Sequence, residues 1–177
     1  MNQLLNNFYE RKDKYYELLI IFIILPIFSI VTGQEPINNF ISMYIISIFY
    51  WYFLYRNKVK IFNNNKYSER HVIITFVAIF IFSFSYCYDA DNFMVFPKEN
   101  PLTFLLVIFL YPFLSVIPQE IIFRKYFFFK FNALMPRNYL IFINGLVFSL
   151  AHVFFNNYIA IIFTFFGGIY LSWSYLR

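Results

Sequence analysis

Long apolar stretches dominate the chain, and short polar connections separate them. A helix that crosses the roughly 30 Å hydrocarbon core of a bilayer needs about 20 mainly apolar residues, because each residue rises about 1.5 Å. Six stretches meet or nearly meet this length: 18–34, 37–55, 72–88, 102–119 with a polar continuation, 139–155 and 158–176. None alternates with period two over a long distance, which disfavours a barrel. The pattern predicts an all-α, polytopic membrane protein with about six transmembrane helices in a bundle.

The composition indicates that lipid, and not water, surrounds most of the protein. Of its 177 residues, 61% are hydrophobic and 13% are charged, whereas a soluble domain carries about 25% charged residues. Too few polar side chains remain to cover a water-facing surface, which excludes a soluble globular protein. The apolar stretches also fill most of the chain, so no room remains for a separate soluble catalytic domain.

The basic residues indicate the orientation of the chain in the membrane. The formal net charge of +5 comes from 14 Lys and Arg residues against 9 Asp and Glu residues. The basic residues flank the apolar stretches and form no basic stripe, so a nucleic-acid partner is not expected. Positive residues are retained on the cytoplasmic side, and six alternating spans place every Lys and Arg except Lys98 on one face. We therefore expect a multi-pass protein of the cell membrane with both termini in the cytoplasm.

Prolines and glycines interrupt several of the apolar stretches. Pro26, Pro112 and Pro118 each remove one backbone N–H donor, so we expect each to kink its helix. Gly167 and Gly168 lie in the last stretch, where the absence of side chains permits close contact with another helix.

Three ionisable residues within the predicted spans are candidates for function. An ionisable residue in hydrocarbon costs free energy and marks a functional site by default. Glu120 and Arg124 are four residues apart and therefore share a helix face. If the fourth helix continues to Lys130, Glu120 lies about 15 Å from its cytoplasmic end, and His152 lies about 20 Å beyond Tyr139 on the fifth helix. We predict that the carboxylate, the guanidinium and the imidazole meet in one buried cavity open to the cytoplasm.

A structural interpretation of the same residues stays open. Glu120 and Arg124 alone are compatible with an interfacial salt bridge at a helix end. A single histidine in a helix, such as His152, can also bond a neighbouring carbonyl. His71 stands at the start of the third span, where an interfacial position explains it. The asparagines Asn144, Asn156 and Asn157 are interpreted as loop or interfacial residues.

Two short segments around these residues resemble known motifs. Residues 118–124 read Pro-Gln-Glu-Ile-Ile-Phe-Arg, and residues 148–152 read Phe-Ser-Leu-Ala-His. They resemble the first two motifs, Glu-Glu-xxx-Arg and Phe-xxx-His, of the CAAX-protease and bacteriocin-processing family of intramembrane proteases. The intervening length is also similar, and the resemblance extends over about residues 102–177. It implies an N-terminal membrane region of three transmembrane helices over residues 1–101 and a catalytic core over residues 102–177.

The chain departs from the family pattern in two ways. Gln119 stands in place of the first Glu, as in a Pro-Gln-Glu subgroup, and Glu120 matches the second. The third family motif, a His-xxx-Asn or related pattern, belongs on a further helix after the last span. His152 and Asn156 have its spacing, but the Phe-xxx-His context assigns His152 to the second motif. We expect a C-terminal truncation or a degenerate family member.

The resemblance implies hydrolysis of peptide bonds in membrane-associated proteins or peptides, in a bacterial cell membrane. Glu120 would take a proton from water as general base, and Arg124 would orient its carboxylate. His152 would position the water or donate to the developing oxyanion, where a prearranged donor contributes about 3–4 kcal/mol. The missing third motif would leave that oxyanion site incomplete.

The sequence gives no indication of a cofactor. A catalytic zinc commonly takes three protein ligands, and only Glu120 and His152 present themselves, so we expect no protein-bound metal. Cys87 is the only cysteine, which excludes an intramolecular disulfide and a site of several thiolates. No base lies near Cys87 in sequence to activate its thiol, so we expect this thiol to be inert in catalysis.

Two other functions stay open. A catalytically inactive family member would act as a bacteriocin-immunity or peptide-binding membrane protein, with the same helices holding the peptide. A small transporter component is the third possibility, since six spans suit many carriers, although the sequence contains no convincing internal repeat.

Overall fold

The computed structural model describes residues 2–33, 36–59 and 79–177. These residues form helices and connecting turns, without strands, which confirms the all-α prediction for this part of the chain. The chain divides into two compact units, one formed by residues 1–61 and 115–177 and the other by residues 62–114. The predicted boundary between residues 101 and 102 stays a prediction.

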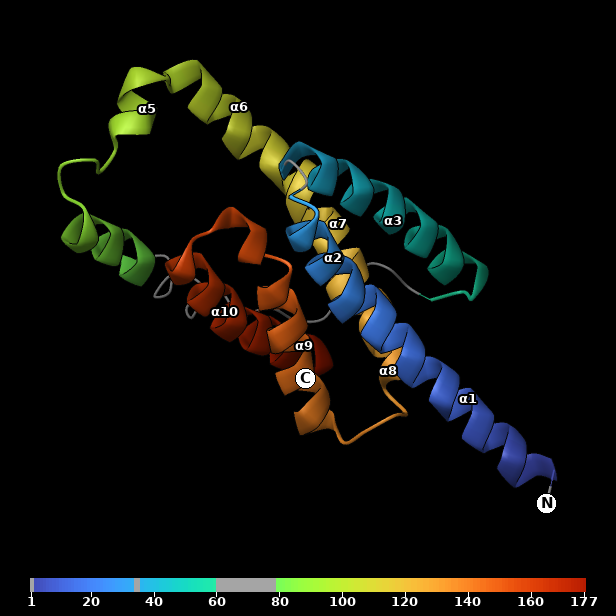
Figure 1. Ribbon diagram of the computed structural model, residues 1–177. Helices are drawn as coiled ribbons and strands as arrows, with labels where there is room; N and C mark the ends of the chain where they lie inside the picture. Colours follow the sequence, from blue (N-terminus) through green and yellow to red (C-terminus); the bar gives the residue numbers. More distant parts are fainter. Residues whose placement is uncertain (1, 34–35, 60–78) are drawn as a thin grey trace. The chain divides into compact units, whose positions relative to one another are not determined.

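The first unit begins with two long helical segments (Figure 1). In the first, α1 (Asn2–Leu19), a π-helical turn η1 (Ile20–Ile24) and α2 (Leu25–Val31) follow one another without a break. The second segment is α3 (Pro36–Arg56). The predicted first span, 18–34, therefore covers the end of α1, η1 and α2, and the second span, 37–55, coincides with α3.

The C-terminal part of the same unit holds all three candidate residues. Its elements are η2 (Pro112–Val116) at the unit boundary, α7 (Ile117–Glu120), η3 (Ile121–Tyr126), α8 (Phe127–Phe131), α9 (Arg137–Leu150), η4 (Val153–Phe155) and α10 (Tyr158–Leu176). Predicted span 139–155 differs most from the structure, because α9 ends at Leu150. His152 then bonds the Ser149 carbonyl through its backbone N–H, and Asn156 adopts a left-handed conformation with φ of 51°. This tight turn replaces the last helical turn that the sequence predicted.

The second unit is described from residue 79. It contains the helix Ile79–Tyr88, α5 (Val95–Glu99) and α6 (Pro101–Tyr111). Asp89 ends the first helix by accepting hydrogen bonds from both the backbone and the side chain of Asn92. The third predicted span, 72–88, lies partly outside the described residues.

Each proline inside an apolar stretch lies close to a π-helical turn. The turn η1 ends two residues before Pro26, η2 begins at Pro112, and η2 and η3 flank Pro118. A proline cannot donate the usual helical bond and its ring crowds the carbonyl four residues back, so the wider π turn relieves both problems. The α to π change thus accounts for the helix disturbance that the sequence predicted at these prolines. Arg124 lies inside one of these π turns, η3.

Aromatic residues dominate the core of the first unit. Phe22 makes edge-to-face contacts with Phe123, Phe127 and Phe131, with ring centroids 5.3–6.0 Å apart. All four rings are buried, and edge-to-face pairs of this kind are favourable beyond their area burial. These contacts pack η1 against the helical segment that carries Glu120 and Arg124.

A polar cluster joins α1 to the same segment. Glu17 accepts a hydrogen bond from the Tyr126 hydroxyl and forms an ion pair with Lys130 at 2.9 Å. Tyr126 also stacks on Tyr50 of α3, with ring centroids 3.7 Å apart. Figure 1 shows α1 running beside α8, as these contacts require. Two helices from the N-terminal part of the chain, α1 and α3, therefore pack against the segment that carries Glu120 and Arg124.

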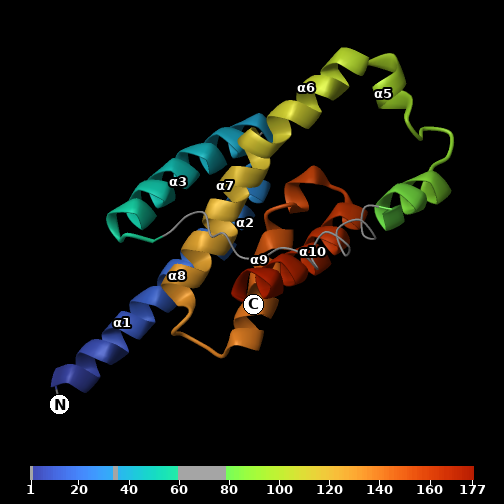
Figure 2. The ribbon, with the colours of Figure 1, turned by 180° about the vertical axis from the view of Figure 1, so that it is seen from behind.

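The helices α9 and α10 lie side by side (Figure 2). Their closest approach is at two glycines: a Cβ added to Gly168 would lie 3.0 Å from the Cα of Gly145 and 3.2 Å from Phe148 Cδ1. A Cβ on Gly145 would meet Ile169 Cγ1 at 2.6 Å. Gly168 therefore makes the predicted close contact, whereas a Cβ on Gly167 would meet nothing within 4 Å.

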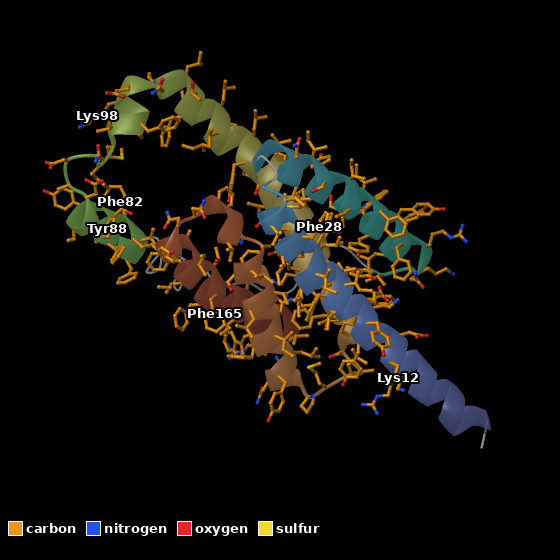
Figure 3. The ribbon with its side chains drawn as sticks, in the orientation of Figure 1. Lys12, Phe28, Phe82, Tyr88, Lys98 and Phe165 are labelled. Carbon is orange, nitrogen blue, oxygen red and sulfur yellow. The ribbon has the colours of Figure 1, made fainter. Side chains whose placement is uncertain are left out.

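Apolar side chains cover much of the outer surface of the helices (Figure 3). In α6, for example, no residue is buried. Two of the described helices are long and apolar enough to cross a membrane, Pro101–Phe131 and Tyr158–Leu176. Soluble monomers rarely expose apolar surface on this scale. The number of six spans stays a prediction.

Candidate functional site

Glu120 and Arg124 lie next to each other, as their spacing predicted. Glu120 ends α7 and Arg124 lies one turn later in η3. The distance from Arg124 Nε to Glu120 Oε1 is 3.9 Å, which is an ion pair but too long for a hydrogen bond. The Arg124 side chain is only 1% exposed, whereas that of Glu120 is 46% exposed. The pair is therefore asymmetric, with a fully enclosed cation and an accessible carboxylate.

Asn144 bonds the enclosed guanidinium, and Ser172 bonds Asn144. Arg124 Nη1 donates to Asn144 Oδ1 at 2.5 Å, and Asn144 Nδ2 donates to the Phe123 carbonyl at 2.6 Å. The Ser172 hydroxyl lies 2.8 Å from the same Asn144 oxygen and 2.6 Å from the Gly168 carbonyl. Asn144 and Ser172 are fully buried. One small network therefore links η3, α9 and α10.

The ring of Phe148 covers another side of the guanidinium. Arg124 Cζ lies 4.9 Å from the centroid of this ring, a distance at which the cation and the ring attract each other. Phe148 also contacts Phe123 edge to face at 5.2 Å. The aromatic residue of the Phe-xxx-His segment thus packs directly against the arginine of the preceding segment.

Two nitrogens of Arg124 have no hydrogen-bond partner within the described part of the chain, namely Nε and Nη2. In the planar guanidinium these two nitrogens share one edge, because Nη1 is the nitrogen on the side of Cδ. Glu120 Oε1 lies 3.9 Å from Nε, which is one of the two nitrogens on this edge. An arginine edge of this kind matches the two oxygens of a carboxylate.

His152 lies in the turn after α9 and contacts the same phenylalanine. Its Nδ1 is 2.8 Å from the Phe148 carbonyl, and its ring lies 4.8 Å from the Phe148 ring. A carbonyl can only accept, so Nδ1 carries the proton and Nε2 of the neutral ring is left as an acceptor. Among the described residues no hydrogen bond to Nε2 is found.

The predicted meeting of three groups is therefore seen in part. Glu120 and Arg124 form an ion pair, and Arg124 and His152 both contact the ring of Phe148. No ion pair or hydrogen bond joins His152 to either of the other two in the chain as described. The carbonyl bond of His152 is the one that the structural interpretation anticipated. The roles of all three residues stay predictions.

Asn144 is the residue that the sequence interpretation missed. It was assigned to a loop or an interface, but it is fully buried within α9 and bonds Arg124. Its partners are 20 and 28 residues away, so no local pattern identifies them. One signal was present, since Asn144 lies well inside the predicted span 139–155, where a buried asparagine amide requires hydrogen-bond partners. Asn157, by contrast, caps α10 by accepting from the backbone N–H groups of Ile159 and Ala160.

The described residues contain no cluster of three or more His, Cys, Asp and Glu side chains that could hold a metal ion. The expectation of no protein-bound metal stays a prediction. Gln119 lies beside Glu120 and donates through Nε2 to the Ser115 hydroxyl at 2.9 Å. Two surface hollows of about 500 Å³ are lined by residues of α3 and of the α9–α10 pair, and neither includes a candidate residue.

Comparison with known proteins identifies the C-terminal part of the chain. Residues 101–177 match the family model described as type II CAAX prenyl endopeptidase Rce1-like. This match includes all three candidate residues and covers less than half of the chain. No curated protein and no solved structure matches the chain. Residues 101–177 are thus similar to Rce1-like type II CAAX prenyl endopeptidases, and this match confirms the resemblance to the CAAX-protease and bacteriocin-processing family for this part of the chain.

Proposed function

We propose that the protein is an intramembrane endopeptidase that hydrolyses peptide bonds of membrane-associated proteins. The observation that carries this proposal is the pairing of an accessible carboxylate, Glu120, with an enclosed and fixed cation, Arg124, inside an Rce1-like domain. A carboxylate held in this way is suited to act on a water molecule at a defined position.

Glu120 is the general base in this proposal. It accepts one proton from a water molecule, and the resulting hydroxide attacks the carbonyl carbon of the scissile peptide bond. When the tetrahedral intermediate collapses, the C–N bond breaks and the protonated carboxyl returns its proton to the leaving amine. Gln119 cannot take this role, because a neutral amide does not accept a proton near neutral pH.

His152 positions the water in this proposal. Its Nδ1–H is engaged by the Phe148 carbonyl, so Nε2 offers a lone pair to the second hydrogen of the water. This geometry favours water positioning over the other expected role, donation to the oxyanion, because donation from Nε2 requires the protonated ring.

The membrane arrangement is also part of the proposal. Six spans with both termini in the cytoplasm place the basic connections on one face. The substrate is then a membrane-associated protein or peptide, and the protein resides in a bacterial cell membrane. Two of the described helices have the length and apolar character that this arrangement requires.

Cleavage of membrane-anchored peptides in proteoliposomes tests the proposal, with products identified by mass spectrometry. We expect Glu120→Gln to lower kcat by about 10² to 10⁴, the usual contribution of a general base. Glu99→Gln, at an exposed carboxylate of α5, is the matched control and should cleave at the normal rate. Cleavage that survives Glu120→Gln would show that another group activates the water.

A catalytically inactive member that binds a bacteriocin or a peptide is the second candidate. The observation that favours it is Gln119, an amide in place of the first glutamate of the family pattern, with its side chain bonded to Ser115. In this case the wild-type protein protects cells, and protection persists in Glu120→Ala and His152→Ala variants. Appearance of cleavage only in Gln119→Glu would likewise identify an inactive protein that lacks its base.

A further inference from the structure

Asn144 and Ser172 lie outside both motif segments, yet Asn144 makes the shorter of the two hydrogen bonds of the Arg124 guanidinium, and Ser172 bonds the same oxygen of Asn144. Asn144 Oδ1 accepts from Arg124 Nη1 at 2.5 Å, and the Ser172 hydroxyl lies 2.8 Å from the same oxygen. All three side chains are nearly or fully buried. Two helices, α9 and α10, therefore contribute one residue each to the support of an arginine on η3.

The amide of Asn144 has a fixed orientation. Its Nδ2 donates to the Phe123 carbonyl at 2.6 Å, so its oxygen must point to Arg124. Phe123 directly precedes Arg124, and Arg124 Nη1 also reaches the Phe123 carbonyl at 3.3 Å. The asparagine thus bonds both the backbone before the arginine and the end of the arginine side chain. Rotation of the guanidinium would break at least one of these bonds.

The consequence concerns the opposite edge of the guanidinium. With Nη1 held by Asn144 and the face covered by Phe148, the planar group keeps its Nε and Nη2 edge toward Glu120. This edge has no hydrogen-bond partner among the residues that the structure describes. The buried donors are therefore available to the Glu120 carboxylate, which needs to move by only about 1 Å to reach hydrogen-bond distance.

We propose that Asn144 and Ser172 are positioning residues. Asn144 holds Nη1 of Arg124, and Ser172 holds the oxygen of Asn144, so that the Nε and Nη2 edge of the guanidinium faces the carboxylate of Glu120. The expected effect on kcat rests on the proposed function. The orientation of the Arg124 guanidinium does not depend on it. Neither residue touches the substrate, and both act through Arg124.

Two readouts test the proposal on Asn144→Leu, which keeps the size of the side chain but removes its donor and acceptor, and on Ser172→Ala. In cleavage assays we expect kcat to fall about 10- to 100-fold, the usual effect of losing a supporting partner, while KM stays constant. Ser172→Cys keeps the size but donates poorly, and it should resemble Ser172→Ala.

Nuclear magnetic resonance of protein with ¹⁵N-labelled arginine gives the second readout. In the wild type, the hydrogen bond to Asn144 slows rotation about the Cζ–Nη1 bond of Arg124, and separate Nη–H signals are expected. In Asn144→Leu these signals should merge and exchange faster with water. Ser47→Ala is the matched control, since Ser47 is a buried serine that bonds only its own helix, through the Tyr44 carbonyl. Its Arg124 signals and cleavage rate should equal those of the wild type.

The two readouts separate the possible failures. If the wild type cleaves no substrate but the Arg124 signals merge in Asn144→Leu, the positioning is correct and the proposed protease function is wrong. If the wild type cleaves and Asn144→Leu keeps both the cleavage rate and separate signals, the positioning is wrong and the function stands. Unchanged Arg124 signals in all variants overturn the proposal regardless of activity.

Discussion

At the scale of single residues, the central feature is an arginine enclosed in a largely aromatic environment. Removing a cation from water is costly unless it is paired and hydrogen-bonded. Arg124 meets this requirement in part, through Asn144, the Phe148 ring and the nearby Glu120 carboxylate. Making all of these contacts at once depends on the flat, forked shape of the guanidinium, which an ammonium group lacks.

This dependence predicts the effect of replacing Arg124 by lysine. Arg124→Lys retains the charge but cannot bond Asn144 while also facing Glu120, so we expect the free energy of unfolding to fall by about 2 kcal/mol, the usual value of a hydrogen bond to a charged group. Reversible unfolding in mixed micelles measures this change. Arg56→Lys, on the exposed end of α3, should alter the stability by less than about 0.5 kcal/mol. Equal losses in both variants would mean that the network around Arg124 does not stabilise the fold.

The sequence predicted contacts between residues that are close together in the chain, and it missed contacts between residues that are far apart. Glu120 and Arg124 are one turn apart, so helix geometry alone placed them together. The contact of Arg124 with Asn144 depends on how α9 packs against η3, which no local pattern encodes. For His152, the sequence correctly indicated a carbonyl bond as one possibility, but it did not show that the helix ends two residues earlier.

At the scale of elements, the pairing of α9 with α10 determines where Asn144 and Ser172 meet. The helices approach most closely at Gly145 and Gly168, where a Cβ would collide with backbone or side-chain atoms. Without a hydrophobic driving force between helices in lipid, such close contact is a main source of association. The sequence predicted glycine-mediated contact in the last helix, but it could not distinguish Gly168 from its neighbour Gly167.

The two neighbouring glycines provide a matched pair of variants. Gly168→Ala places a methyl group 3.0 Å from the Gly145 backbone, and we expect a loss of about 1–3 kcal/mol in the free energy of unfolding. Gly167→Ala meets no atom within 4 Å and should leave the stability unchanged or raise it by up to about 1 kcal/mol, because alanine favours a helix. Unfolding curves recorded in the same detergent compare the free energies of unfolding of the two variants. A stronger effect at Gly167 would contradict the observed contact between the helices.

At the scale of the whole molecule, the distribution of charge predicts the orientation in the membrane. Basic residues flank the apolar stretches, and the predicted six spans would place all of them except Lys98 on the cytoplasmic face. The all-helical fold and the membrane character followed from composition and pattern, since both depend on averages over many residues. The number of spans depends on segments that include residues 72–78, which lie outside the described part of the chain.

The single cysteine permits a direct test of this orientation. Cys87 is exposed, and the predicted topology places it at the outer face. A membrane-impermeant maleimide should therefore label the wild type in intact cells. Cys87→Ser combined with Asn132→Cys, at an exposed position in the basic connection before α9, should be labelled only after the cells are permeabilised. Labelling of both positions from the same side would require a different number of spans between them.

The packing of η1 and α3 has a consequence for the autonomy of the matched region, residues 101–177. The similarity to known proteins begins at residue 101, yet Phe22, Tyr50 and Leu54 belong to the same buried cluster as Phe127. Residues far upstream of the recognisable domain therefore supply part of its interior. Residues 101–177 expressed without the N-terminal helices would therefore expose the side of Phe127 that Phe22 and Leu54 cover, and they would need another apolar surface in that place.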